Sequence, residues 1–90
     1  MLKLDLYPAS HAFLQTLPPK QFRQVALRMF ALLETPQPHD RRPVHGTPYW
    51  RVDVGEYRII YSVADDILEV PLIGKRNDDE VYRRLKRRER

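Results

Sequence analysis

The chain has 90 residues and no cysteine, so it can build neither a disulfide framework nor a metal site with thiolate ligands. This length is typical of one small domain, and we expect residues 1–90 to fold as a single unit. The N-terminal stretch MLKLDLYPAS has no long apolar core, so the sequence predicts neither a signal peptide nor a membrane span. We therefore expect a cytoplasmic protein.

Positive charge is concentrated at the C-terminal end. The 16 lysine and arginine residues outnumber the 12 aspartate and glutamate residues, which gives a net charge of +4 at pH 7. Residues 75–90 contain eight basic and four acidic side chains and so account for the whole excess. A localised basic segment is typical of a surface that binds phosphates, although the solvated end of a helix has the same composition.

The N-terminal pattern predicts a strand followed by a short helix. Residues Leu2 to Tyr7 alternate apolar and polar side chains, as in a strand with one solvated face, and Pro8 ends the strand. Ser10 is a candidate N-terminal cap for the short helix. The apolar side chains of this helix are Phe13, Leu14 and Leu17.

A second, longer helix follows the sequence LPPK, because proline is tolerated in the first turn of a helix. Its apolar residues recur with the helical period and predict one buried stripe. The stripe consists of Phe22, Val25, Ala26, Met29, Phe30 and Leu33. The segment Glu34 to Pro48 holds four of the eight prolines and is predicted to be a loop.

Three strands and a helix are predicted after this loop. The strands are Tyr49 to Val54, Tyr57 to Ala64 and Ile67 to Ile73. Gly55 and Glu56 suit a two-residue hairpin turn, and two aspartates form the next turn. Pro71 lacks a backbone donor, so it predicts either an edge strand or a bulge. Acidic residues open and basic residues close the segment 78–88, which favours a loosely docked helix.

The predicted order is β-α-α-β-β-β-α, which defines an α+β fold. We expect a small antiparallel sheet with the two N-terminal helices packed on it and a short basic helix at the C-terminus.

Charged side chains in the two middle strands are predicted to share a surface. Because side chains alternate along a strand, a short hairpin places Arg51, Asp53 and Arg58 on one face. The last strand then delivers Lys75 and Arg76 at the end of the sheet. Arginine forks match phosphate oxygens, but the same pattern is also typical of cross-strand ion pairs on a solvated face.

The ordered set HGTPYWRVDVGEYRIIY, IGKR and EVYRR resembles the RelE/ParE superfamily of type II toxins, and more closely its RelE-like branch. The resemblance covers essentially the whole chain. It implies a ribosome-dependent endoribonuclease that cleaves mRNA in the ribosomal A site and is silenced by a cognate antitoxin. It implies no cofactor and no metal, and the three histidines have no spacing typical of metal ligands.

The resemblance also implies roles for individual residues. Arg58 and Arg76 match two catalytic arginines that stabilise the phosphate and assist the leaving group, and Tyr82 matches a catalytic aromatic residue. Arg51 matches the first of two basic positions, but Asp53 stands where the family has a second cation. Asp53 is therefore either a general base or an ion-pair partner of Arg51 or Arg58.

Further cations are candidates for RNA binding: Lys75, Arg83, Arg84 and Arg87. Two other interpretations stay open. The chain could be a ParE-like toxin that binds DNA gyrase without cleaving RNA, or a catalytically weak relative that mainly binds its antitoxin. The apolar residues of the first helix could contact an antitoxin helix or simply pack in the core.

Overall fold

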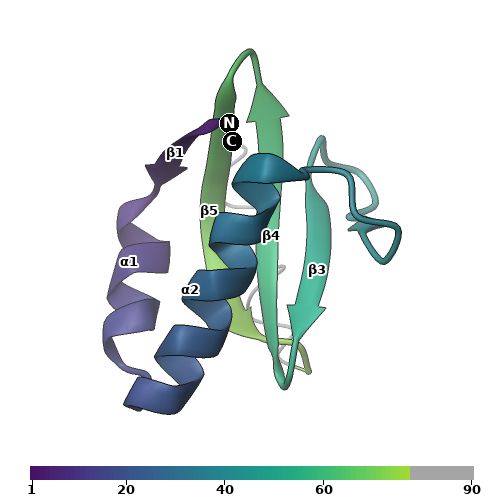
Figure 1. Ribbon diagram of the computed structural model, residues 1–90. Helices are drawn as coiled ribbons and strands as arrows, with labels where there is room; N and C mark the ends of the chain where they lie inside the picture. The colour runs from purple at the N-terminus through teal and green to yellow at the C-terminus, as the bar shows by residue number, and fades with distance from the viewer. Residues whose placement is uncertain (78–90) are drawn as a thin grey trace.

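The computed structural model describes residues 1–77. Within them the chain forms two helices and five strands (Figure 1). In chain order these are β1 (Lys3–Leu6), α1 (Pro8–Gln15), α2 (Pro19–Glu34), β2 (Arg42–Pro43), β3 (Trp50–Val54), β4 (Tyr57–Ala64) and β5 (Ile67–Lys75). The predicted α+β class is confirmed, whereas the helix expected at 78–88 lies outside the described residues.

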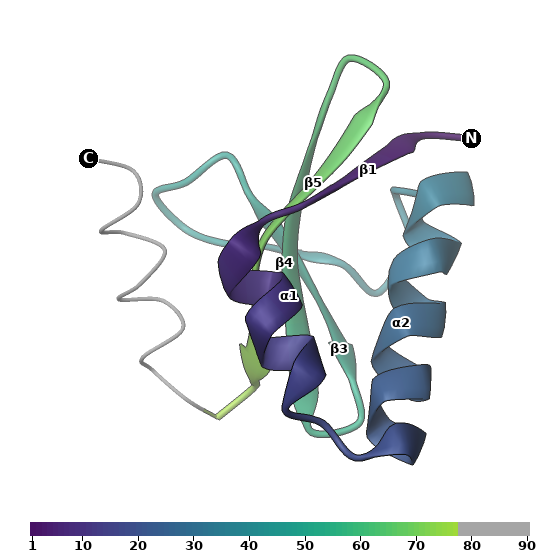
Figure 2. The same ribbon diagram turned by 90° about the vertical axis from the view of Figure 1, so that its left-hand side faces the viewer.

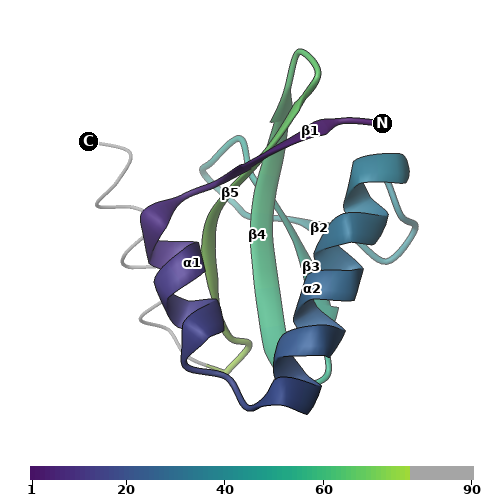
Figure 3. The same cartoon turned by 60° about the vertical axis from the view of Figure 1, so that its left-hand side comes forward.

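The five strands form one sheet in the order β1-β5-β4-β3-β2. Both helices lie across the same face of this sheet (Figures 2 and 3), and α2 packs on it through its buried residues. The β3–β4 and β4–β5 pairs are antiparallel hairpins, as the sequence predicts. The opposite face of the central strands is therefore left without a described helix.

The first strand departs from the expected antiparallel arrangement, because β1 pairs with β5 in parallel. Parallel neighbours need a long connection, and the two helices and the other strands between β1 and β5 provide it. The Leu2 amide also donates to the Leu33 carbonyl at 3.0 Å, which ties the start of the chain to the end of α2.

Ser10 is not the helix cap that the sequence predicts. The helix begins at Pro8, so Ser10 lies inside α1 and is completely buried. Its Oγ donates a hydrogen bond of 2.8 Å to the Val70 carbonyl of β5. A buried hydroxyl needs such a partner, and this one fixes α1 against the sheet.

The buried stripe of α2 differs from the predicted one, because Leu32 joins it and Phe22 and Phe30 do not. Val25, Ala26, Met29 and Leu32 are buried against the sheet. Phe22 and Phe30 are 44% and 49% exposed, because they lie at the edges of the stripe. Helical periodicity alone does not fix how wide a face the sheet covers.

The main core lies between the helices and the sheet. Alternate residues of the three central strands supply it, and Val52, Ile59, Tyr61, Leu68 and Val70 are at most 1% exposed. A second, smaller cluster of Val44, Ile60 and Leu72 lies apart from this core. Two-residue alternation along each strand produces this division.

Pro71 lies at a β-bulge, so that half of the prediction is confirmed. Ile60 pairs with Leu72, but Ser62 pairs with Glu69, so β5 has one extra residue between these pairs. The missing amide of proline thus falls where the ladder is interrupted. The alternative of an edge strand is wrong, because β5 lies between β1 and β4.

The predicted loop contains a strand that the sequence did not reveal. Residues Arg42–Pro43 form β2, which pairs with Trp50 and Arg51 at one edge of the sheet. Two contacts hold the loop. The Tyr61 hydroxyl donates to the Pro36 carbonyl at 2.7 Å, and Arg28 binds both carboxylate oxygens of Asp40 at 2.8 Å.

Neither helix in residues 1–77 is long and apolar enough to cross a membrane.

Two valines provide a matched test of this packing. Val52 is 1% exposed and Val63 is 43% exposed. We expect Val52→Ala to lower the free energy of unfolding by about 2–3 kcal/mol, because it removes two buried methyl groups and leaves a cavity. Val63→Ala should change it by less than about 1 kcal/mol. Urea unfolding followed by circular dichroism measures both, and equal losses would contradict the arrangement of the core.

Candidate functional site

The β3–β4 hairpin gathers charged side chains on one face of the sheet. Asp53 pairs directly with Arg58, and Arg51 pairs with Ile60. The neighbouring positions Val52 and Ile59 belong to the core beneath the helices. Because side chains alternate, Arg51, Asp53 and Arg58 occupy the face away from α1 and α2. The sequence predicts this shared face correctly.

Asp53 and Arg58 form an ion pair with two hydrogen bonds. The Arg58 Nε donates to Asp53 Oδ1 at 2.7 Å, and Nη2 donates to Oδ2 at 3.3 Å. The Arg58 side chain is only 13% exposed, and that of Asp53 is 37% exposed. Arg58 thus forms a cross-strand ion pair, but it lies mostly buried and not on a solvated face, and its guanidinium is oriented by a carboxylate. A two-point contact of this kind fixes the plane of the guanidinium.

Arg76 approaches the pair from the end of β5. Its backbone amide donates to the Glu56 carbonyl at 2.9 Å, which places it beside the β3–β4 turn. Gly74 is the cross-strand neighbour of Arg58, and Arg76 follows it by two residues. Arg58, Gly74 and Arg76 thus continue along one face, with no side chain at the glycine between the two arginines.

The pKa of the Asp53 carboxyl reports the charges around it. The hydrogen bond from Arg58 lowers this pKa most, while burial of the carboxyl opposes the shift. The positive charges of Arg58, Arg51 and Arg76 lower the pKa further. Three arginines from three strands or strand ends therefore lie close enough to act electrostatically on a single carboxylate.

Lys75 is separated from this cluster. It pairs with Tyr57, whose side chain belongs to the core beneath the helices, and it is exposed at the end of β5. Because side chains alternate along the strand, Lys75 and Arg76 lie on opposite faces of the sheet. The other predicted site residues, Tyr82, Arg83, Arg84 and Arg87, lie outside the described residues.

Three guanidinium groups and one carboxylate give the cluster a net positive charge. Such a surface suits a phosphate, which accepts hydrogen bonds from guanidinium forks and is attracted by their charge. In residues 1–77, no group of three His, Asp or Glu side chains gathers in a way that could hold a metal ion.

A second feature, the stack of Arg41 on Trp50, was not predicted from the sequence. The Arg41 Cζ lies 3.5 Å from the centroid of the Trp50 ring. The two residues are brought together by β2, whose pairing with β3 is too short to leave a sequence pattern. The only signal was a single tryptophan near two arginines in a proline-rich segment.

A family model described as the ParE toxin of the type II toxin-antitoxin system, parDE, matches residues 10–80. The chain belongs to this ParE toxin family. The RelE/ParE superfamily that the sequence resembles is thereby confirmed, and the chain is a toxin of the type II class. No curated protein sequence matches the chain.

Solved RelE structures share the fold of this ParE-family chain. The archaeal RelE-RelB complex from Pyrococcus horikoshii OT3 is 25% identical, with a TM-score of 0.73, over 83% of this chain and 94% of that one. The isolated E. coli RelE toxin is 21% identical, with a TM-score of 0.75, over 98% of both chains. A mutant of E. coli RelE in the free state reaches a TM-score of 0.81 at 21% identity, over 97% of this chain and 96% of that one.

The ion pair predicts a pH-dependent contribution to stability. We expect Asp53→Asn to lower the free energy of unfolding by about 1–2 kcal/mol at pH 7, between the values typical of exposed and buried pairs. The pKa of Asp53 is lowered in the folded state, so this contribution is complete above the unfolded value of about 4 and is lost as the pH falls through the folded value.

Urea unfolding of both proteins between pH 2 and 7 measures this difference. Asp66→Asn is the matched control, because the Asp66–Lys3 pair is 3.6 Å long and exposed. A pH-independent difference, or an equal loss in the control, would contradict a stabilising role for the pair.

Proposed function

We propose that this type II toxin is an endoribonuclease that cleaves mRNA in the ribosomal A site and so inhibits translation in the cytoplasm. The observation that carries the proposal is the convergence of Arg51, Arg58 and Arg76 around Asp53 on the sheet face opposite the helices. The resemblance of the sequence to RelE-like toxins, and the RelE fold of the chain, support the same class of reaction.

The proposed reaction is attack of a ribose 2′-hydroxyl on the adjacent phosphate. The new bond joins the 2′-oxygen to phosphorus, and the bond to the 5′-oxygen of the next nucleotide breaks. The products are a 2′,3′-cyclic phosphate and a 5′-hydroxyl fragment, with one proton leaving the nucleophile and one joining the leaving oxygen. The ribose supplies the nucleophile, so the step needs proton transfer and positive charge rather than a bound cofactor.

Arg58 and Arg76 are suited to the charge that develops on the phosphate. Both lie next to Asp53 at one end of the β3–β4 hairpin, and Arg58 is mostly buried, where a charge acts through less water. We propose that Arg58 stabilises the five-coordinate phosphate and that Arg76 assists the leaving 5′-oxygen. Arg51 adds positive charge from the neighbouring strand.

Asp53 acts in this proposal by positioning Arg58 and not as the general base. Its carboxylate is occupied by two hydrogen bonds from Arg58, and its lowered pKa makes it a weaker base than an ordinary aspartate. Much of the rate would then come from the in-line geometry that the ribosome imposes on the mRNA.

Residues of the C-terminal segment also take part in the proposed reaction. Tyr82 would orient a base or the nucleophile, and the cations Lys75, Arg83, Arg84 and Arg87 would bind RNA phosphates. The role of Tyr82 follows from the resemblance to the RelE-like branch, and the roles of the cations follow from the positive charge of residues 75–90.

A cognate antitoxin is the proposed protein partner. The solved relatives include RelE-RelB complexes from Pyrococcus horikoshii and E. coli. In this chain Leu14 is buried and Phe13 packs partly against the core, as does Leu17, which lies just beyond the end of α1 and not within it as predicted. The first helix therefore keeps little apolar surface for a partner. Leu27 and Phe30 of α2 are 59% and 49% exposed and offer more.

One other function has specific support, because the matching family model is that of the ParE toxin. A ParE-like toxin would bind DNA gyrase and leave RNA intact. Arrest of gyrase supercoiling by the purified chain, with mRNA uncut in a translation reaction, would favour this function over the proposed one. A catalytically weak relative would do neither and would retain only antitoxin binding.

In vitro translation followed by primer extension on the mRNA tests the nuclease. We expect cuts within codons that require ribosomes, and at least a hundredfold slower cleavage by Arg76→Ala, because it removes charge from the transition state, a loss of about 3 kcal/mol. Arg23→Ala is the control, since Arg23 is exposed on α2. Uncut mRNA with the wild-type chain, or equal rates for both variants, would contradict the proposal.

The Asp53→Asn variant tests whether Asp53 positions Arg58 or accepts the proton of the 2′-hydroxyl. If the carboxylate only orients Arg58, we expect the single-turnover cleavage rate to fall by less than about tenfold, because an amide oxygen still accepts a hydrogen bond. A loss near a thousandfold, with Arg58→Lys much less affected, would assign the general base to Asp53 instead.

A further inference from the structure

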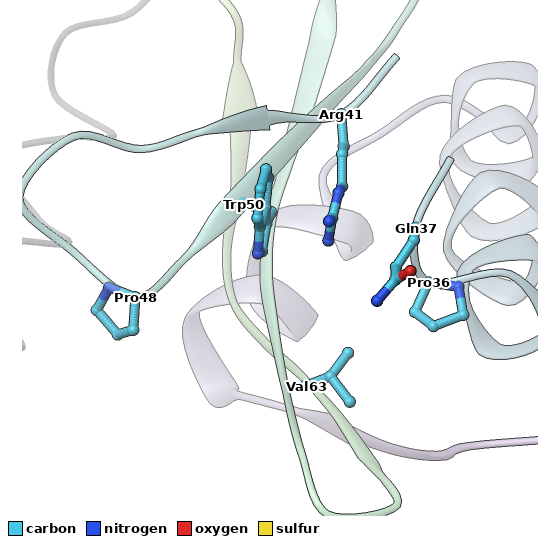
Figure 4. A pocket seen from close by; sticks show the side chains of 6 residues that line it. All are labelled: Pro36, Gln37, Arg41, Pro48, Trp50 and Val63. Carbon is cyan, nitrogen blue, oxygen red and sulfur yellow. The ribbon is translucent and has the colours of Figure 1, made fainter. Parts of the chain in front are cut away.

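A pocket of about 340 Å³ lies away from the arginine cluster (Figure 4). It is formed by the loop after α2, the start of β3 and the end of β4. Its lining residues are Pro36, Gln37, Arg41, Pro48, Trp50 and Val63. Trp50 and Asp53 are three residues apart on β3, which separates them by about 10 Å and places them on opposite faces of the sheet. The pocket is thus distinct from the proposed phosphate site.

The guanidinium of Arg41 forms a flat wall of this pocket. It lies 3.5 Å from the centroid of the Trp50 ring, a short cation–π contact that holds the side chain in place. In Figure 4 it lies between the Trp50 ring and the side chain of Gln37. One face of the guanidinium therefore covers the indole, and its other face is turned to Gln37.

The loop that carries Arg41 and Gln37 is held in position. The buried Tyr61 hydroxyl donates to the Pro36 carbonyl at 2.7 Å. Arg28 neutralises Asp40, next to Arg41, through both carboxylate oxygens at 2.8 Å. Arg41 is then the single charged side chain among the six that line the pocket. The pocket is preformed, positively charged and flanked by the apolar surfaces of two prolines and Val63.

These features match one ligand class. A guanidinium plane stacks on a nucleobase, and a carboxamide both donates and accepts hydrogen bonds, as the edge of a base requires. The positive charge of Arg41 favours a ligand that also carries a phosphate. The volume lies at the small end of the range of about 300–1,000 Å³ typical of ligand sites. We propose that this pocket binds a nucleotide, with its base stacked on the face of the Arg41 guanidinium that is turned to Gln37 and the Gln37 carboxamide within reach of the base.

Ligand binding in the pocket can be followed by the fluorescence of Trp50, because it is the single tryptophan of the chain. The full-length chain is titrated with AMP, UMP, ribose 5-phosphate, inorganic phosphate and a short single-stranded RNA, and the fluorescence of Trp50 is followed. We expect a saturable change with AMP, UMP and RNA and none with ribose 5-phosphate or phosphate. No saturable change, or an equal change with ribose 5-phosphate, would overturn the proposal.

The relative affinities for RNA and for free nucleotides show which of the two is the ligand. RNA that binds at least about tenfold more tightly than AMP and UMP would identify a polynucleotide site, because the chain adds phosphate contacts. Equal affinities would identify a free nucleotide as the ligand. Both outcomes support a nucleotide pocket.

Arg41→Lys keeps the charge and removes the plane, so we expect it to weaken RNA binding about tenfold in fluorescence anisotropy with labelled RNA. Arg42→Lys is the matched control, because Arg42 is exposed and does not line the pocket. Equal effects of the two substitutions would overturn the proposal. Circular dichroism establishes that each variant is folded.

Gln37→Ala provides a second variant in an exposed part of the loop. We expect it to weaken the binding of both AMP and UMP at least about threefold, since the amide lies within reach of the base and can form hydrogen bonds with it. Unchanged affinities would contradict the proposed role of Gln37. Arg58→Lys and Arg76→Lys should leave the AMP titration unchanged, so failure of the nuclease proposal is distinguishable from failure of this one.

Discussion

The pairing of Asp53 with Arg58 across the β3–β4 hairpin is the interaction on which the proposed site depends. The carboxylate of Asp53 on β3 orients the guanidinium of Arg58 on the neighbouring strand β4, and the Arg58 side chain is only 13% exposed. Arginine is too basic to lose its proton, so a mostly buried arginine requires a partner that compensates its charge. The same carboxylate lies in the field of Arg51 and Arg76, which makes it the common neighbour of all three cations.

The rest of the fold serves to place this hairpin. Core residues on one side of the strands pack beneath α1 and α2, and this packing forces the alternate positions to the other face. A one-residue slip of β3 against β4 would exchange the two sets, so the core fixes the register of the charged residues as well. The bulge at Pro71 then interrupts the β4–β5 ladder before Gly74 and Arg76 reach the end of the sheet.

Local patterns in the sequence account for most of this architecture. The alternation of apolar residues and the turn residues Gly55 and Asp65 predict the two hairpins, and the positive φ angles of 59° and 57° at those residues agree with these turns. The shared face of Arg51, Asp53 and Arg58 follows from the same alternation. The burial of Arg58 does not, because it depends on how closely its surroundings pack.

Local sequence patterns could not predict the contacts between segments that are far apart in the sequence. The parallel pairing of β1 with β5 and the bond from Ser10 to Val70 join segments about sixty residues apart. Phe22 and Phe30 share the period of the buried stripe, but the width of the sheet beneath α2 leaves them exposed. The stack of Arg41 on Trp50 arises from a two-residue strand, which carries no periodicity.

The central claim is that Arg58 and Arg76 act on one phosphate. A double-mutant cycle on single-turnover cleavage of ribosome-bound mRNA, with Arg58→Lys, Arg76→Lys and both together, tests it most directly. If both side chains stabilise the same transition state, the double variant should lose at least about tenfold less rate than the product of the single losses. Losses that multiply would show that the two arginines act independently and would contradict this account of the site.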